Sequence, residues 1–233
     1  LPNHPLLEDL DTASIYDLAH IIQELLNYKK RTSNATIAET LVVEVTIDKE
    51  AAPGKQEIRL LGKSGLTNPM YFVVGVLPEI REQEPNDPKF PIALPEQSAL
   101  TLPVVINGQI IQGDTDRFSF TAKKGQKLVF TTEARSLNPY LADAVPGWFQ
   151  AALTLYDNQG KELAYDDDYQ VNPDPTIFFT VTADGTYRIQ IGEALFRGRE
   201  EFVYRLAMDE LPFITAAYPI GGNSLQPLPI EVT

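Results

Sequence analysis

Hydrophobic and polar residues alternate over short stretches of the second half of the chain, and turn residues separate these stretches. Alternation with a period of two is typical of strands that have one face in a core. The turns include Lys124-Gly125, Asp157-Asn158-Gln159-Gly160 and Asp184-Gly185. The pattern predicts strands near residues 101–111, 117–121, 127–133, 151–156, 162–165, 176–182, 186–192 and 202–208. Eight such strands with no helical period between them predict a mainly β fold, an antiparallel β-sandwich of the jelly-roll kind.

The first part of the chain has a different pattern. Between residues 11 and 30, apolar residues recur at helical spacing, which predicts one N-terminal helix. The period then changes to two, and strands are expected near 41–47, 57–61 and 71–76. Three strands are too few for an independent sandwich. They are similar to the later half of an immunoglobulin-like (Ig-like) module whose first half would lie upstream of Leu1.

The end of the chain has two more candidate strand segments, at 214–222 and 228–232. They are similar to the opening strands of a further Ig-like module. The expected organisation is therefore a helical segment at 1–35, a partial Ig-like β module at 36–78, a sandwich at 79–210 and the start of another module at 211–233.

Composition and charge narrow the classes of function. The 233 residues carry a formal net charge of −13, which disfavours nucleic acid because nucleic-acid binding requires a basic face. The same charge disfavours anionic membrane surfaces, and no apolar run reaches the length of about 20 residues needed to span a membrane. The chain has no cysteine, so disulfides, thiol catalysis and thiolate metal sites are excluded.

The most distinctive polar stretch is the acidic segment 82–88, which combines Glu82, Glu84, Asn86 and Asp87 with two prolines. Pro85 favours an extended Glu84, and in an extended chain Glu82 and Glu84 point to the same side. Two carboxylates so placed repel each other unless a cation lies between them. Oxygen ligands at short spacing suit Ca²⁺, whereas the alternative interpretation is a solvated, proline-stiffened linker.

A second acidic motif, Gly113-Asp114-Thr115-Asp116, leads into the predicted strand at 117–121, and three further motifs follow it. These are Leu153-x-Leu155-Tyr156-Asp157-x-x-Gly160, Ala183-Asp184-Gly185-Thr186-Tyr187 and Phe202-Val203-Tyr204-Arg205-Leu206. Over residues 79–210, this series resembles the bacterial pre-peptidase C-terminal domain, a family related to the collagen-binding domains of clostridial collagenases.

The resemblance implies a calcium site. In calcium-binding relatives, the acidic linker and the turn before the second strand supply ligands to one ion. Carried over to matching positions, the implied metal ligands are Glu82, Glu84, Asn86, Asp87, Asp114 and Asp116. This chain departs from those relatives, which often have extra residues between the two turn aspartates.

Other residues are weaker candidates for a site. Tyr140, Trp148 and Phe149 lie on one long loop and are either a stacking surface for a polysaccharide or a fibrous protein, or a plug over one end of the sandwich. The run Asp166-Asp167-Asp168, with Asp174 nearby, is either a solvated loop or a second cation site. His4 and His20 have no nucleophile motif beside them, and no catalytic residue is assigned.

Together these features predict a non-catalytic accessory or spacer module of a multi-module bacterial protein, ordered by Ca²⁺ where the linker meets the sandwich. The resemblance implies a location outside the cell or at its surface, with neighbouring modules of the same polypeptide as partners. A module that binds extracellular polysaccharide or fibrous protein through the aromatic loop is the alternative. A hydrolase domain is a third interpretation.

Overall fold

The computed structural model describes residues 18, 21–22, 43–63, 65–83, 99–138, 148–199, 201–224 and 227–233. The predicted N-terminal helix at 11–30 lies outside these residues except for Leu18, Ile21 and Ile22, which are helical. The described part of the chain contains no helix long and apolar enough to cross a membrane.

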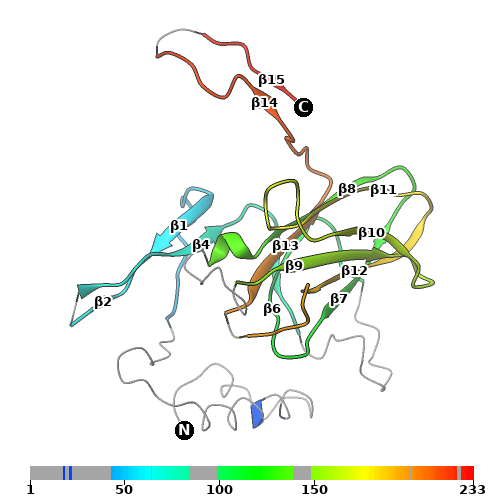
Figure 1. The fold of residues 1–233 in the computed structure, drawn as a ribbon, viewed down its shortest axis with the longest axis horizontal. Helices are drawn as coiled ribbons and strands as arrows, with labels where there is room; N and C mark the ends of the chain where they lie inside the picture. The colour runs from blue at the N-terminus through cyan, green and yellow to red at the C-terminus, as the bar shows by residue number, and fades with distance from the viewer. Residues whose placement is uncertain are drawn as a thin grey trace.

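Two sheets packed face to face make up the centre of the molecule (Figure 1). The first sheet has five strands, in the order β11 (Thr176–Thr180), β8 (Lys127–Glu133), β13 (Val203–Asp209), β6 (Val104–Gln109) and β5 (Glu79–Arg81). The second has four strands, in the order β10 (Glu162–Asp166), β9 (Ala151–Tyr156), β12 (Gly185–Glu193) and β7 (Asp116–Ala122). Every neighbouring pair is antiparallel except β5 and β6, which are parallel.

One hydrophobic core fills the space between the sheets, because alternate residues of each strand point inward. In β7 the buried positions are Asp116, Phe118, Phe120 and Ala122, and the residues between them are more exposed. Phe120 is completely buried, and its ring lies 5.5 Å from Phe130 and 5.9 Å from Tyr187. The period of two in the sequence therefore reflects a sheet face that meets the facing sheet.

The eight strands predicted between residues 101 and 208 are confirmed as β6 to β13, and the mainly β class is confirmed with them. The predicted turn at 157–160 joins β9 to β10, where Asp157 Oδ1 accepts hydrogen bonds from the backbone N–H groups of Gln159 and Lys161, both at 2.9 Å. The jelly-roll connectivity stays a prediction.

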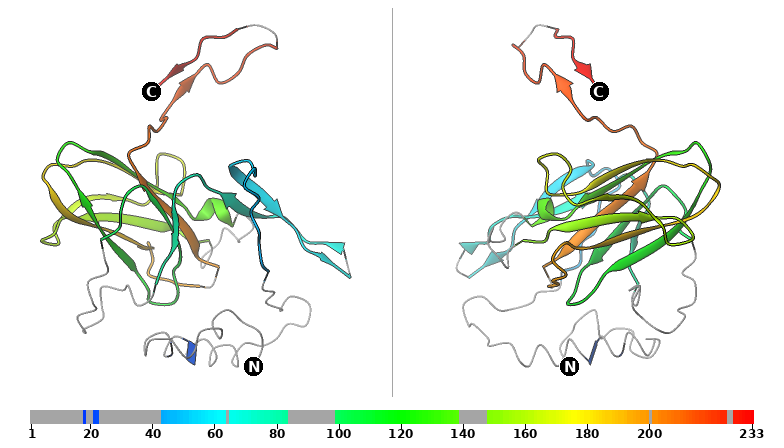
Figure 2. Two further views of the ribbon diagram at one scale, coloured as in Figure 1. Left: turned by 180° about the vertical axis from the view of Figure 1, so that it is seen from behind. Right: turned by 45° about the vertical axis from the view of Figure 1, so that its right-hand side comes forward.

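Short strands precede and follow the sandwich in the sequence. Before it, β1 (Gly54–Ile58) pairs with β4 (Met70–Val74), and β2 (Leu61–Gly62) pairs with β3 (Gly65–Leu66). After it, β14 (Ala217–Tyr218) pairs with β15 (Glu231–Val232) in a hairpin that stands away from the sandwich (Figure 2). A 3₁₀ turn, η2 (Arg135–Leu137), follows β8.

The strand predicted at 41–47 is wrong over its described part, residues 43–47, which pair with no other strand. Val43, Val45 and Ile47 alternate as a strand would, yet they are 49%, 46% and 50% exposed. Alternation gives a strand only where a neighbouring strand and a core are present to use it.

The linker before the sandwich contains a strand that the sequence did not predict. In β5, Glu79, Ile80 and Arg81 pair with Val105, Ile106 and Asn107 of β6. β5 begins at the residue where the sequence placed the start of the sandwich domain, although the division into four domains stays a prediction. Through β5, the linker becomes the edge strand of the five-stranded sheet.

Candidate functional site

The pairing of β5 with β6 brings Glu82 to the sandwich. The Glu82 backbone N–H donates to the Asn107 carbonyl at 3.0 Å, which continues the ladder by one residue. The Gln109 backbone N–H donates to Glu82 Oε1 at 2.7 Å. These two bonds fix both the backbone and the carboxylate of Glu82 beside β6.

Glu82 meets two residues of the sandwich interior there. The Tyr204 hydroxyl lies 3.0 Å from Glu82 Oε2 and 2.5 Å from Asp116 Oδ2. Tyr204 is 1% exposed and Asp116 is completely buried. Thus the linker and β7 supply two carboxylates to one phenol on β13, and we call Glu82, Asp116 and Tyr204 the carboxylate–tyrosine cluster.

Gly108 of β6 makes room for this cluster. It lies opposite Tyr204 in the β6–β13 ladder. A Cβ atom at position 108 would lie 2.3 Å from the Tyr204 hydroxyl and 2.4 Å from Glu82 Oε2, both too close for any side chain. Glycine is therefore required at this position for the cluster to form.

The hydrogen atoms of the cluster constrain its charge. The Tyr204 hydroxyl has a single hydrogen, so it can donate to only one of the two carboxylates. Burial raises the pKa of Asp116 well above its ordinary value, and the negative charges of Glu82 and Asp114 raise it further. Burial and the charges of Asp116 and Glu82 also raise the pKa of Tyr204. Burial and the neighbouring carboxylates outweigh the Tyr204 hydrogen bond, which lowers the pKa of Asp116, so they favour a proton on this carboxyl.

Asp114 lies at the edge of the same cluster, in the turn that leads into β7. Its Oδ1 accepts from the Thr115 backbone N–H at 2.8 Å, and its Oδ2 accepts from the Ile111 backbone N–H at 3.2 Å. Its charge acts on Asp116. Asp114 therefore both shapes the turn and adds a third carboxylate near the cluster.

Part of this arrangement suits a cation. Asp116 Oδ1 is buried and has no hydrogen-bond partner among the described residues, which is a costly state for a carboxylate oxygen and one that a bound cation would relieve. Among the described residues, no group of three or more acidic or histidine side chains is already arranged to hold a metal ion. The predicted ligands Glu84, Asn86 and Asp87 lie outside the described residues, so the structure brings together Glu82, Asp116 and Asp114 from the predicted set of six.

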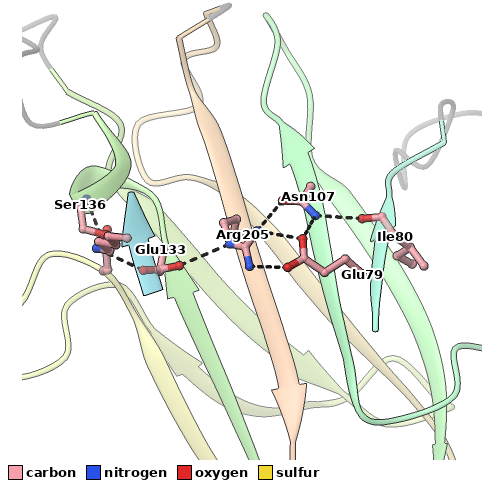
Figure 3. A network of polar contacts seen from close by, with 8 residues as sticks. Glu79, Ile80, Asn107, Glu133, Ser136 and Arg205 are labelled. Carbon is pink, nitrogen blue, oxygen red and sulfur yellow. Dashed lines mark hydrogen bonds and ion pairs between the residues drawn. The ribbon is translucent and has the colours of Figure 1, made fainter. Parts of the chain in front are cut away.

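A second polar network connects the linker to the outer face of the same sheet (Figure 3). Arg205 of β13 forms ion pairs with Glu79 of β5 at 2.8 Å and with Glu133 of β8 at 3.4 Å. Asn107 Nδ2 donates to Glu79 Oε2 at 2.9 Å. The hydrogen bond from Arg205 holds the pKa of Glu79 below its ordinary value.

This network extends to the flanking hairpin. Lys55 of β1 forms an ion pair with Glu133 at 3.1 Å, and its ammonium group lies 5.9 Å from the centre of the Tyr71 ring. Glu133 thus lies between Arg205 of the sandwich and Lys55 of the hairpin. We call the connected side chains of Glu79, Asn107, Arg205, Glu133 and Lys55 the junction network.

One of the three residues of the predicted aromatic loop is part of the core. Phe149 is 2% exposed and stacks on Phe202 with ring centres 5.1 Å apart, so it is part of the core. Trp148 is half-buried, with the Arg135 guanidinium 5.2 Å from the centre of its ring. Tyr140 lies outside the described residues. The burial of Phe149 agrees with the plug interpretation, and ligand binding by Trp148 stays a prediction.

The acidic run at 166–168 includes carboxylates with structural partners. Asp166 Oδ2 accepts from the Thr176 backbone N–H at 2.7 Å. Asp174, which is 2% exposed, accepts from the backbone N–H groups of Arg135 at 2.7 Å and Ser136 at 3.1 Å. Asp166 and Asp174 therefore stabilise the chain around them, and the alternative of a second cation site gains no support from these contacts.

Sequence reasoning missed Tyr204, Gly108 and the junction network. A signal for Tyr204 was present, because it occupies an inward position of an alternating strand and a buried tyrosine hydroxyl needs a partner. The partner of Arg205 could not be found from the sequence, since Glu79 lies 126 residues away on a strand that was not predicted.

Comparisons with known proteins agree with the resemblance seen in the sequence. Residues 114–193 match the family model described as "Bacterial pre-peptidase C-terminal domain". A probable subtilase-type serine protease of Deinococcus radiodurans is 38% identical over 78 residues, which are 34% of this chain and 10% of that protein. The match therefore spans only about a tenth of the length of this curated relative.

Two solved structures are similar to parts of the fold. The pre-peptidase C-terminal domain of a collagenase from Bacillus anthracis aligns with a TM-score of 0.36 and 16% identity, covering 50% of this chain and 98% of that domain. PliG of Aeromonas hydrophila, a periplasmic inhibitor of g-type lysozyme, aligns with a TM-score of 0.31 and 12% identity, covering 57% of this chain and 95% of that protein. By its family match, the central part of this chain, residues 114–193, belongs to a bacterial pre-peptidase C-terminal domain.

Proposed function

We propose that this chain is a non-catalytic accessory module of an exported bacterial peptidase, and that Ca²⁺ orders its junction with the preceding linker. The family match and the protease relative support the accessory role. The carboxylate–tyrosine cluster supports the cation, and the observation that carries it is the buried Asp116 Oδ1, which has no partner in the part of the chain that the structure describes. Neighbouring modules of the same polypeptide are the proposed partners.

The chemistry of the cluster explains how a cation would act. Ca²⁺ prefers carboxylate and carbonyl oxygens and takes six to eight of them. Glu82 and Asp116 bring two carboxylates to one point, and Asp114 adds negative charge beside them. Glu84, Asn86 and Asp87 would complete the set from the adjoining linker. A cation bound by both groups would replace the proton that the cluster otherwise favours and would tie the linker to β7.

A calcium titration followed by thermal unfolding tests this role. A ligand that binds only the folded state stabilises it by about 2.7 kcal/mol at 100 times its dissociation constant. We therefore expect added Ca²⁺ to raise the melting temperature and a chelator to reverse the rise. If neither has an effect on the wild-type protein, the calcium role is wrong.

A pair of variants locates the site. Asp116→Asn keeps the shape of the side chain but removes its charge, so the response to Ca²⁺ should be lost. Asp48→Asn is the matched control, since Asp48 is an exposed acidic residue outside the cluster and outside the acidic run at 166–168, and its loss should leave the calcium response intact. Equal responses in both variants would place the ion elsewhere.

A further inference from the structure

The strand β11 ends the five-stranded sheet, and no described strand pairs with its outer edge, which we call the open edge. Its ladder with β8 pairs Val181 with Gln126 through a hydrogen bond of 2.9 Å, and Thr132 donates to Pro175 at 3.1 Å. Residues alternate along an antiparallel strand, so Ile177 and Phe179 also bond to β8. The N–H and C=O groups of Thr176, Phe178 and Thr180 therefore point to the open edge.

Among the described residues, a partner on that edge is found only for the first of these three positions. The Thr176 N–H donates to Asp166 Oδ2 at the end of β10. Within the described part of the chain, the N–H groups of Phe178 and Thr180 have no hydrogen-bond acceptor. The edge thus presents two adjacent pairs of backbone donors and acceptors.

This edge also differs in composition from the other sheet ends. The end strands β5, β7 and β10 each contain charged residues, namely Glu79 and Arg81, Asp116 and Arg117, and Glu162 and Asp166. β11 has the sequence Thr-Ile-Phe-Phe-Thr, with no charge and no proline. Charges and prolines on edge strands prevent them from pairing with other chains, so β11 lacks the usual protection against such pairing.

An aromatic groove lies on the outer face beside this edge. Phe178, which is 45% exposed, packs edge-on against Phe213 with ring centres 5.2 Å apart, and Tyr169 contacts both rings. After β13, the segment 210–213 borders a groove of about 390 Å³ whose walls include Val129, Phe178, Leu211 and Phe213. The groove carries Lys127 and Glu210 as its charged residues.

We propose that β11 is a docking edge for an extended peptide segment of another polypeptide, which adds as a strand and places an aromatic or large aliphatic side chain in the groove. Backbone hydrogen bonds to Phe178 and Thr180 would supply the pairing, and the groove would select the side chain. The outward backbone groups of the edge favour a peptide over a polysaccharide. A sugar ring would stack on the aromatic faces and would have no use for a row of backbone donors and acceptors. This site is independent of the proposed calcium role.

The test uses the full chain and a defined probe, the acetylated and amidated peptide Lys-Thr-Phe-Thr-Phe-Thr-Lys. We expect it to slow amide hydrogen exchange at Phe178 and Thr180, measured by NMR. Two N-methylated forms of the same peptide provide the internal control. One is methylated at alternate residues along one backbone edge of the peptide, and the other along the opposite edge. Methylation on one edge should abolish binding, and methylation on the other should leave it unchanged. Unchanged exchange at both amides would overturn the proposal.

Protein variants separate strand addition from ring stacking. Thr180→Pro removes an outward N–H without removing a bond to β8, and Phe178→Ala removes a groove wall. Each should weaken peptide binding about tenfold or more, whereas Val171→Ala, at a residue 99% exposed and outside the groove lining, should not. Retention of the wild type and Thr180→Pro alike on a polysaccharide column, without peptide binding, would show that the face binds sugar and would overturn the proposal.

Two further results would also contradict it. Protection of Phe178 and Thr180 that grows with protein concentration and without peptide would show that a second copy of the chain occupies the edge. Binding that persists with all N-methylated peptides would show that the backbone is not recognised. Peptide binding is measured both with Ca²⁺ and with a chelator. The test of the docking edge therefore holds whether or not Ca²⁺ binds the protein.

Discussion

The sandwich and the segments that flank it are built from similar strand patterns but have opposite environments. In β7, Phe118 and Phe120 are 3% and 0% exposed because the facing sheet covers them. In the C-terminal hairpin, Tyr218 of β14 and Ile220, which follows that strand, are 77% and 92% exposed. Leu61, at the tip of the N-terminal flank, is 80% exposed. Large hydrophobic residues thus stabilise the sandwich and contribute little to the flanking segments.

The difference shows what determines stability in this chain. Burial of apolar area is the main favourable term in folding, and a two-stranded ribbon alone buries too little to be stable. The N-terminal hairpin compensates in part through charge, since Lys55 reaches Glu133 of the sandwich. The stability of the described chain should therefore come mainly from the sandwich, with a small contribution from the junction network.

The largest effect is expected from the core itself. Phe120→Ala removes a fully buried ring between the sheets and should lower the free energy of unfolding by about 3–5 kcal/mol. The matched control in the flank is Ile220→Ala, which should change it by less than about 0.5 kcal/mol because the side chain is 92% exposed. Urea denaturation of both variants gives the comparison, and similar losses would show that the flank has a core after all.

An intermediate effect is expected at the end of β12, from a buried ion pair. Glu193 is 3% exposed, pairs with Arg197, and accepts from the Leu195 and Arg197 backbone N–H groups at 2.7 and 3.0 Å. Burial alone would raise its pKa, but the hydrogen bonds and charge of Arg197 and the Leu195 N–H outweigh it and hold the pKa below its ordinary value. Glu193→Gln should cost about 1.5–3 kcal/mol at pH 7.

The sign of its pH dependence follows from that lowered pKa. The folded protein binds a proton at Glu193 less readily than the unfolded chain, so this stabilisation is fully present above the ordinary pKa of a glutamate and is lost as the pH falls through the folded pKa. The stability curves of wild type and Glu193→Gln should therefore converge in acid. Denaturation between pH 3 and pH 7 measures this, and parallel curves would be inconsistent with it.

The smallest effect is expected at the junction. Arg205→Met removes the ion pairs with Glu79 and Glu133 and should lower stability by about 1–2 kcal/mol, with the fastest new amide exchange in β5. Arg59→Met breaks an exposed ion pair with Glu57 in the flank and should change stability by less than about 0.5 kcal/mol. Hydrogen exchange that rises equally in β5 and β12 would mean that Arg205 supports the whole sandwich instead of the junction.

The fold could be predicted from the sequence where a strand has a covered face. The eight sandwich strands were found because burial on one face imposes a period of two on residues such as Phe118 and Phe120. The same rule failed at Val43 and Val45, where alternation occurs without a partner strand. It also missed β5, since Glu79-Ile80-Arg81 is short and polar and becomes a strand through a parallel pairing with distant residues.

The candidate site was predictable only in part, for a related reason. Glu82 and Asp116 could be named because carboxylates near a turn and a strand start are visible in the sequence, and the structure places both against Tyr204. What joins them is a non-local geometry, in which β5 pairs with β6 and Gly108 leaves space. No local pattern reports how strands far apart in sequence pair, so the tyrosine between the two acids stayed hidden.

The parallel strand β5 has a mechanical consequence. The chain comes into the five-stranded sheet at Glu79, opposite Val105 of β6, and leaves it from β13, where Met208 lies opposite Val104. These two strands, β5 and β13, are the two neighbours of β6, so the points of entry and exit are about 10 Å apart at the usual spacing of strands. The chain therefore enters and leaves the sandwich at the same end. Tension along the chain would separate β5 from β6 instead of stretching the sandwich along its length.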